Sequence, residues 1–212
     1  MALAVDTYQL GPIGTNCYVV RADEAARDAV VVDPGGDAEL LGAELAAAGS
    51  SCAAIILTHT HFDHLGGVAD LAGATGAPVY VSPDAAGGLA SPFSPPGLEV
   101  RGFEGARHVT GGDTLELAAI GFEVLDVPGH APGHLSYYAD GSLFSGDVLF
   151  AGGVGRVDLP GGDWDTLLDS IRLLAERYPP ETVVYSGHGH ATTLGAELER
   201  NPFLAELRSA SQ

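Results

Sequence analysis

The sequence predicts an α/β protein in which two sheets pack face to face and helices cover both outer faces, giving four layers. Two observations lead to this prediction. Short apolar strands are interleaved with amphipathic helices along the whole chain, and the second half repeats the scheme of the first, strands, then helix, then strand. No linker interrupts the pattern, so residues 1–212 are expected to form a single domain.

Composition limits the classes of partner. Hydrophobic residues make up 46% of the chain and charged residues 17%, which is enough apolar material for a sizeable core. The net charge is −19 and every basic residue is Arg, so binding to nucleic acid or an anionic membrane is not expected. No apolar run approaches the ~20 residues of a membrane span, and no leader pattern is visible, so the expected location is the cytoplasm. The oligomeric state is left open.

The first half is predicted from its apolar runs and its turn residues. Runs rich in Val, Ile, Tyr and Leu that end at Gly, Pro or charged residues predict strands at 2–10, 16–21, 28–33, 52–57 and 78–81. Apolar residues at helical spacing predict helices at 37–48, before Gly49, and at about 64–73. Gly66 and Gly67 would let another backbone segment approach the second helix closely. The cysteines, Cys17 and Cys52, are expected to be buried free thiols.

The second half begins after an irregular segment. Residues 82–105 are rich in Pro and Gly and lack periodicity, which predicts a surface flap near the functional site. The strands predicted after it are 114–120, 122–127, 135–139, 142–145 and 182–185. A helix at about 164–177 is expected to begin after Asp163 as its N-cap, and residues 195–208 are also predicted to be helical.

Residues 58–64, Thr-His-Thr-His-Phe-Asp-His, predict a metal site. The apolar residues before them read as a buried strand, so the cluster lies where a strand ends and a loop begins. In an extended segment His59 and His61 share a face and can reach one ion, whereas Asp63 and His64 follow a turn and can point elsewhere. Imidazole and carboxylate together form the ligand set of zinc, manganese and iron.

Three later strand ends offer further ligands. Residues 128–134 contain His130 and His134, residues 145–147 end at Asp147, and residues 186–190 contain His188 and His190. Spacing alone does not choose between the two histidines of each pair. Each stretch has glycine beside its polar residue, as expected where the backbone crowds a site. Taken together, these residues supply the donors that two ions need. Asp33, at the tip of an apolar strand, is either a turn cap or a group that supports the ligands from behind.

These residues resemble the metallo-β-lactamase superfamily. The resemblance is carried by His59-Thr60-His61-Phe62-Asp63-His64, Pro128-Gly129-His130, Gly146-Asp147 and Gly187-His188, in the same order, and it extends from Thr15-Asn16-Cys17-Tyr18 to His188. Within the superfamily the chain looks like the glyoxalase II group, particularly its short single-domain, hydroxyacylglutathione hydrolase-like members. The segment Gly155-Arg156-Val157-Asp158 is part of this likeness. The implied fold is the αββα sandwich with the metal site at one edge.

The resemblance also implies a set of roles. One metal ion would be held by His59, His61 and His130, the other by Asp63, His64 and His188, and Asp147 would bridge them. The implied cofactors are two divalent ions, Zn first, with Fe or Mn as alternatives. His134 is then expected behind the ligands, or as an ordinary strand histidine. Arg156 is a candidate substrate contact, His190 has no assigned role, and His108 is expected at the surface.

The expected activity is hydrolysis of a small-molecule thioester by a hydroxide that bridges the two metals, with Asp63 orienting that nucleophile. A thiolate leaves without a proton donor because thiol pKa values are about 8.5, whereas an amide nitrogen needs one. Glyoxalase II proper uses lysines and a further helical domain to bind glutathione. This chain has no Lys and 24 residues after His188, so the acyl group and thiol carrier stay open. The alternatives are a persulfide dioxygenase with a single iron and a non-catalytic metal-binding or redox module.

Overall fold

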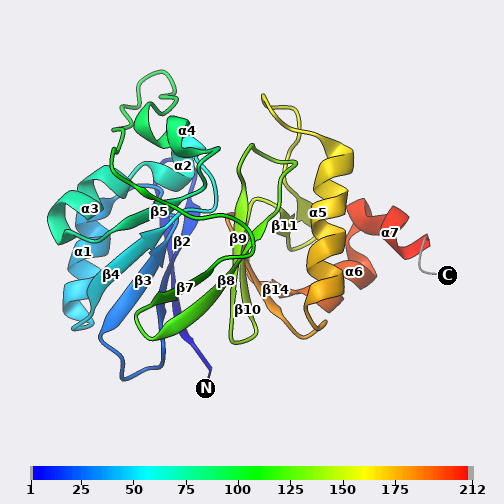
Figure 1. The fold of residues 1–212 in the computed structure, drawn as a ribbon, viewed down its shortest axis with the longest axis horizontal. Helices are drawn as coiled ribbons and strands as arrows, with labels where there is room; N and C mark the ends of the chain where they lie inside the picture. Colours follow the sequence, from blue (N-terminus) through cyan, green and yellow to red (C-terminus); the bar gives the residue numbers. More distant parts are fainter. Residues whose placement is uncertain (1, 210–212) are drawn as a thin grey trace.

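The computed structural model of the protein describes residues 2–209 and contains two six-stranded sheets that face each other. The first sheet has the order β1-β2-β3-β4-β5-β6, antiparallel from β1 to β3 and parallel from β3 to β6. Its strands are β1 (Ala4–Leu10), β2 (Thr15–Arg21), β3 (Asp28–Val32), β4 (Ser51–Ile56), β5 (Val79–Val81) and β6 (Arg107–His108). Figure 1 labels β2, β3, β4 and β5 of this sheet, coloured from blue to cyan, in the left part of the molecule.

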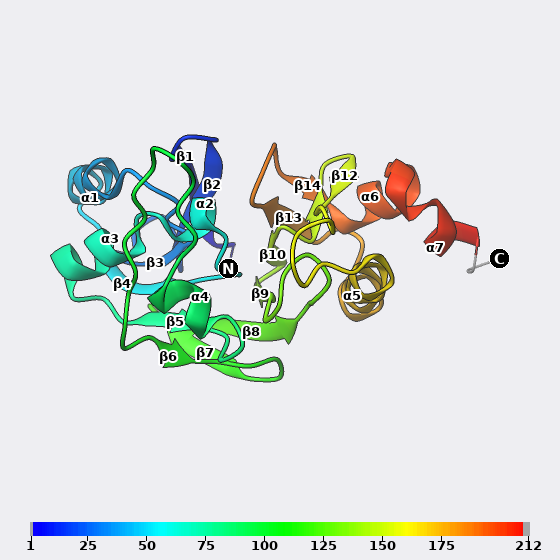
Figure 2. The same cartoon turned by 90° about the horizontal axis from the view of Figure 1, so that it is seen from above.

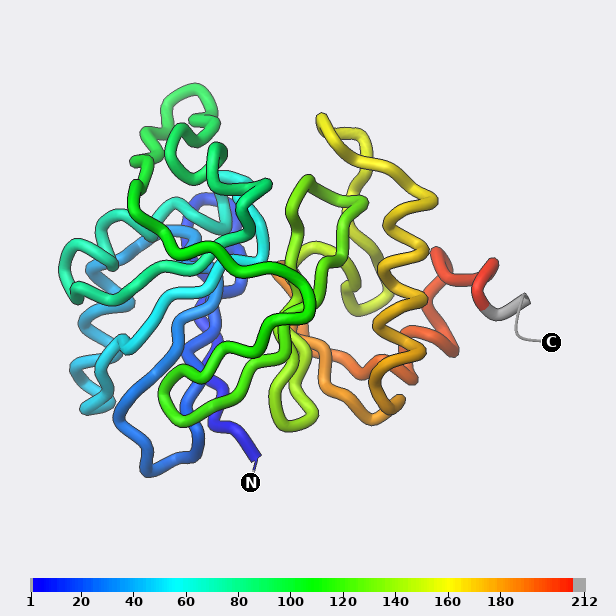
Figure 3. Tube along the Cα trace, in the orientation of Figure 1, coloured from blue at the N-terminus to red at the C-terminus, as the bar shows by residue number. Residues whose placement is uncertain are grey.

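The second sheet has the order β14-β13-β10-β9-β8-β7, with one parallel pair, β10 and β13. Its strands are β7 (Thr114–Leu117), β8 (Ile120–Asp126), β9 (Leu135–Ala139), β10 (Ser142–Gly146), β13 (Val183–Ser186) and β14 (Thr192–Thr193). A separate hairpin is formed by β11 (Leu149–Phe150) and β12 (Gly153–Val154). The tube in Figure 3 shows that the early part of the chain builds one side of the molecule and the late part the other.

Helices cover the outer face of each sheet, which completes the four layers (Figure 2). On the first sheet lie α1 (Ala38–Ala47), α2 (Phe62–Leu65), α3 (Val68–Thr75) and α4 (Ala86–Ala90). On the second lie α5 (Trp164–Arg177), α6 (Leu194–Arg200), a 3-10 turn (Pro202–Leu204) and α7 (Ala205–Ser209). Among residues 2–209, no helix combines the length and the apolar character needed to cross a membrane.

The alternation of side chains along each strand explains why there are three apolar layers. In β3, Val30 and Val32 face the second sheet, where they meet Phe122 and Phe144. Val31, one position along, faces the opposite way, toward the helices on the outer side. A third cluster lies between the second sheet and α5. Burial on both faces makes these central strands continuously apolar, which is the pattern the sequence shows.

Several predicted elements differ from the structure for identifiable reasons. The helix predicted at 64–73 is two helices, because the Gly67 N–H donates to the Pro34 carbonyl at 2.8 Å and the turn at 34–36 presses on Gly66. The turn between β7 and β8 comes earlier than predicted, at Ala118 and Ala119, both with positive φ. The helical region predicted at 195–208 is divided by Pro202, and β6, β11, β12 and β14 were not predicted.

Other predictions are confirmed. Asp163 caps α5 by accepting a hydrogen bond from the Thr166 N–H at 2.9 Å. Cys17 is a buried free thiol, while Cys52 is free and only partly buried. The segment 82–105 does lie beside the His59–His61 loop, since a Cβ on Gly88 would stand 2.5 Å from the Thr60 hydroxyl. It is not irregular throughout, because it contains α4. His108 is exposed, although it lies in β6.

Candidate metal centre

All the predicted ligand residues come together at one edge of the sandwich, where strands of both sheets end. His59 and His61 follow β4, and Asp63 and His64 lie in α2. From the second sheet, the loops after β8, β10 and β13 bring three more residues to the same place: His130, Asp147 and His188. Three groups among them could each hold an ion, with ligand atoms within 4.8 Å of one another. Two of these groups share no residue and are described first; the other, His59, His64 and Asp147, overlaps with both of them.

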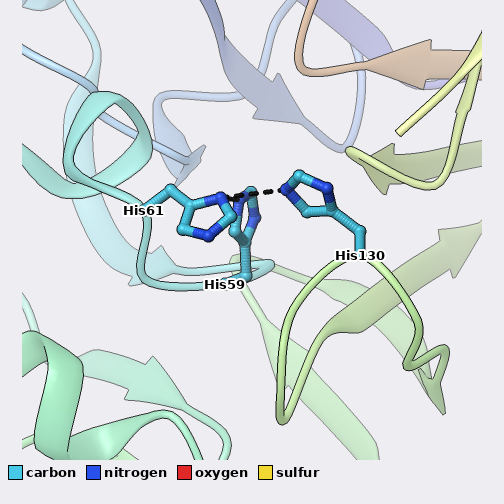
Figure 4. Close-up of side chains that lie close together, drawn as sticks. All are labelled: His59, His61 and His130. Carbon is cyan, nitrogen blue, oxygen red and sulfur yellow. Dashed lines mark hydrogen bonds between the residues drawn. The ribbon is translucent and has the colours of Figure 1, made fainter. Parts of the chain in front are cut away.

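The first group is formed by His59, His61 and His130 (Figure 4). Nδ1 of His61 lies 3.0 Å from Nε2 of His59 and 2.9 Å from Nε2 of His130. The group therefore presents two Nε2 atoms and one Nδ1 atom to a single point. Burial, together with the neighbouring imidazoles, holds the pKa of His59 well below its usual value and lowers that of His61 to about 4.

Hydrogen bonds fix the orientation and tautomer of two of these rings. The Nδ1–H of His130 donates to the Arg156 carbonyl at 2.8 Å, which leaves the lone pair on Nε2. Thr58 Oγ1 donates to Asp33 at 2.6 Å, so at 3.0 Å from His59 it acts as acceptor for that ring's Nδ1–H. The Nε2 lone pairs of His59 and His130 therefore both face Nδ1 of His61, and a cation at this point would be held by all three nitrogens.

The second group is formed by Asp63, His64 and His188. Oδ2 of Asp63 lies 3.5 Å from Nε2 of His64 and 3.3 Å from Nε2 of His188. Hydrogen bonding with Asp147 and Asp63 raises the pKa of His188 to about 9. Burial works against ionisation of Asp63, but its contacts with His188 and His64 prevail and lower its pKa to about 2.

Asp147 lies between the two groups. Its Oδ1 is 3.3 Å from Nε2 of His64, while its Oδ2 is 3.5 Å from His188 and 3.6 Å from Nε2 of His130. Burial disfavours its charge, but the charge of His64 holds its pKa well below the usual range. One carboxylate therefore faces imidazoles from both groups.

Two buried polar atoms without a hydrogen-bond partner indicate whether the site suits metal ions. His64 Nε2 and Asp147 Oδ1 are buried and make no hydrogen bond within the described residues. Buried polar atoms are seldom left unpaired, because each one costs about 1–3 kcal/mol. Both atoms belong to donor types that bind zinc, iron and manganese, and they face one another. The residues present therefore fit divalent metal ions.

Asp33, predicted either as a turn cap or as a support for the ligands, contacts residues next to and within both groups. Its Oδ2 lies 2.9 Å from Nδ1 of His64, and the same atom accepts from the Thr58 hydroxyl that contacts His59. Its Oδ1 accepts the Thr58 N–H at 2.8 Å. The carboxylate thus connects the orientation of His59 with that of His64.

The two histidines of each pair that the sequence left open, His130 or His134 and His188 or His190, lie in different places. His130 points into the first group, whereas His134 is buried behind it and accepts the Asp147 N–H at 3.1 Å through Nε2. His188 belongs to the second group, whereas His190 is exposed and lines a neighbouring cavity of about 690 Å³. Arg156 is exposed and forms a bidentate pair with Asp158 at 2.6 and 2.7 Å.

Glycines make room for these contacts, as the sequence predicts. A Cβ on Gly187 would stand 2.1 Å from Oδ1 of Asp147 and 2.5 Å from the His64 ring. A Cβ on Gly155 would stand 1.9 Å from the Asp147 carbonyl. Sequence reasoning missed Thr58, although its position next to His59 was a usable signal. It also missed Thr15, which donates to Asp63, and nothing local in the sequence connects those two residues.

Comparison with known proteins agrees with this site and fold. A family model described as the Metallo-beta-lactamase superfamily matches residues 10–188, and the chain belongs to this superfamily. The two facing sheets with outer helices are accordingly the metallo-β-lactamase fold, an αββα sandwich.

The proteins that resemble this chain are named for different activities or bound metals. Hydroxyacylglutathione hydrolase GloC of Haemophilus influenzae is 35% identical over 202 residues, covering 89% of this chain and 92% of that protein. The crystal structure of BLEG-1 B3 metallo-beta-lactamase is similar with a TM-score of 0.89 and 40% identity, covering 95% of this chain and all of that one. The crystal structure of TTHA1623 in a di-iron-bound form gives a TM-score of 0.83 and 41% identity, covering 94% and 100%.

Proposed function

We propose that this protein is a metal-dependent hydrolase with two divalent ions and that its substrates are small-molecule thioesters. The observation that carries the proposal is the position of Asp147, whose two oxygens face imidazoles of separate groups. In this assignment His59, His61 and His130 would hold the first ion, Asp63, His64 and His188 would hold the second, and Asp147 would contact both. Residues 1–212 would form the one domain that carries the site.

Two ions at this position would supply a water of lowered pKa and an electrophilic contact for a substrate carbonyl. The chain's own residues have separate tasks. Asp63 is placed to orient the attacking water through a carboxylate oxygen, beside His188. Asp33 and His134 hold the ligands in place through His64 and the Asp147 N–H. The backbone carbonyl of Arg156 contacts His130, and its exposed guanidinium, which is paired with Asp158, would attract an anionic part of the substrate.

The choice of thioester rests on the leaving group. A thiolate departs without a proton because thiol pKa values are about 8.5, whereas an amide nitrogen requires an acid. The buried imidazoles at this edge are either proposed ligands or, like His134, already used as acceptors. The resemblance to GloC favours the same substrate class, while the resemblance to BLEG-1 makes β-lactams the competing class. Zinc is proposed as the native metal, with iron or manganese as the other fitting ions.

A substrate panel with matched metal analysis tests the proposal. The purified protein is assayed with S-lactoylglutathione, several other acyl thioesters and a cephalosporin, and its metal content is measured by elemental analysis. We expect thioester turnover and about two ions per chain. Hydrolysis of the cephalosporin alone would contradict the thioester assignment. One iron per chain with oxygen consumption would instead indicate a persulfide dioxygenase.

Asp63→Asn separates a hydrolase from a non-catalytic metal module. The amide keeps the size of the side chain but removes a charge and a hydrogen-bond acceptor, so we expect turnover to fall by about 10² or more while the first ion remains bound. Asp165→Asn, an exposed carboxylate on α5, is the matched control and should leave turnover unchanged. Equal turnover in wild type and Asp63→Asn would refute the role of Asp63.

A further inference from the structure

Thr15 makes a buried contact with a proposed ligand. At the start of β2, its hydroxyl lies 2.7 Å from Oδ2 of Asp63. Thr15 is completely buried and Asp63 nearly so. An ionised carboxylate can only accept, so the hydroxyl donates this hydrogen bond. The contact joins the first sheet to α2, the short helix that carries Asp63 and His64.

The two oxygens of Asp63 have different surroundings. Oδ2, which receives the Thr15 bond, is also the oxygen that lies 3.3 Å from His188 Nε2 and 3.5 Å from His64 Nε2. Oδ1 makes no hydrogen bond within residues 2–209. The Thr15 bond therefore goes to the oxygen that faces the second group and leaves the other one free.

The last torsion of an aspartate does not fix the plane of its carboxylate. Rotation about χ2 of Asp is broad, so an isolated side chain can turn its oxygens toward or away from a neighbouring group. A partner at a fixed position holds the carboxylate in one orientation. Thr15 is suited to this role because its branched side chain restricts χ1 and its backbone is paired with Leu10 of β1.

The backbone of Asp63 also packs closely against a neighbouring turn. A Cβ on Gly35 would stand 1.8 Å from the Asp63 carbonyl and 3.6 Å from Cβ of Thr15. The turn at Gly35 thus packs directly against the start of α2, next to Thr15. With backbone and hydroxyl both fixed, the orientation of the carboxylate is determined on two sides.

We propose that Thr15 is a positioning residue that sets the affinity of the second metal site by fixing the orientation of the Asp63 carboxylate, so that one of its oxygens faces His64 and His188. The inference rests on the proposed ligand assignment. No hydrogen bond connects Thr15 to His59, His61 or His130 among the described residues, so its effect is confined to one of the two ions.

The test is a stepwise Zn²⁺ titration of the metal-free full chain in competition with a chromophoric chelator. Thr15→Val keeps the shape and removes the hydroxyl, and Thr15→Ser keeps the hydroxyl. We expect the Kd of one binding step to rise about tenfold or more in Thr15→Val, with the other step unchanged and Thr15→Ser close to wild type. Thr7→Val, an exposed threonine on β1, is the control.

The outcomes are distinct. If wild type binds two ions and Thr15→Val binds both with unchanged Kd, the role of Thr15 is refuted and the proposed function stands. Equal weakening of both steps would also refute it, since it would indicate a general structural effect. If wild type binds only one ion, the dinuclear proposal itself fails. Should Thr15→Val not fold, Thr15→Ser against Thr15→Ala isolates the same hydroxyl.

Discussion

The imidazole of His134 is stacked on that of His59, with ring centroids 4.6 Å apart and 16° between their planes. The same ring accepts the Asp147 N–H through Nε2, so its Nδ1 carries the proton and has no partner within the described residues. Burial, aided by the nearby imidazole of His130, keeps the pKa of His134 well below its ordinary value. One neutral ring therefore contacts a residue of the first group and the backbone of the aspartate proposed to bridge both groups.

His134→Phe should weaken metal binding while retaining the stacked ring. Phenylalanine cannot accept the Asp147 N–H, and an unpaired buried N–H costs about 1–3 kcal/mol. We expect a lower Tm of the metal-free protein and roughly tenfold weaker Zn²⁺ binding. Calorimetry and chelator competition measure the two quantities. The exposed His108→Phe serves as control, and equal metal affinity in the two variants would contradict this role.

Gly187→Ala should disrupt the centre through one methyl group. Its Cβ would stand 2.1 Å from Oδ1 of Asp147, so either the loop of His188 or the carboxylate must move. We expect loss of at least one ion per chain, measured by elemental analysis, and a fall in thioester turnover. Gly42→Ala in α1 meets nothing within 4 Å and should be neutral or stabilising by up to about 1 kcal/mol. If Gly187→Ala keeps its full metal content, the close packing of Gly187 against Asp147 does not constrain the centre.

The stability of the metal-free protein should pass through a maximum near neutral pH. His61 has its pKa lowered to about 4, so the unfolded chain gains the proton first and stability falls as pH drops from about 6.5 toward 4. His188 has its pKa raised to about 9, so its contribution is complete below about 6.5 and is lost as pH rises through 9.

Tm measured from pH 4 to pH 10 in the presence of a chelator should therefore be bell-shaped. His61→Ala should flatten the acid side and His188→Ala the alkaline side. Added Zn²⁺ should raise Tm most where the imidazoles are deprotonated, because a ligand that binds the folded state stabilises it. A Tm that is independent of pH between 4 and 9 would contradict the assigned shifts.

Arg156→Gln should alter substrate binding and leave the fold intact. The ion pair with Asp158 is exposed, and such pairs contribute little to stability because water and salt screen them. We expect a higher KM for anionic thioesters such as S-lactoylglutathione, an unchanged KM for neutral ones, and an unchanged Tm. Arg172→Gln removes the exposed pair with Asp169 on α5 and is the matched control. The same KM in both variants would leave Arg156 without a role in binding.

Much of the fold could be predicted because its signals are local. Apolar runs ending at turn residues indicate strands, helical spacing with a cap such as Asp163 indicates α5, and the run His59 to His64 contains four donors within a few positions. The division between α2 and α3 could not be predicted, because it depends on the Pro34 carbonyl, which reaches Gly67 from a distant turn. The hydrogen bond between Thr15 and Asp63 could not be predicted either, because the two residues are far apart in the sequence.

The residue types and their order along the chain already predict which side chains can bind metal ions and that most of them follow strands. The place of His130 in the first group, of His134 behind it and of Asp147 between the two groups depends on how the chain folds. The physical reason is that donor spacing fixes directions only along one strand. Distances between loops depend on how the two sheets pack, and that packing is set by the apolar layer between them.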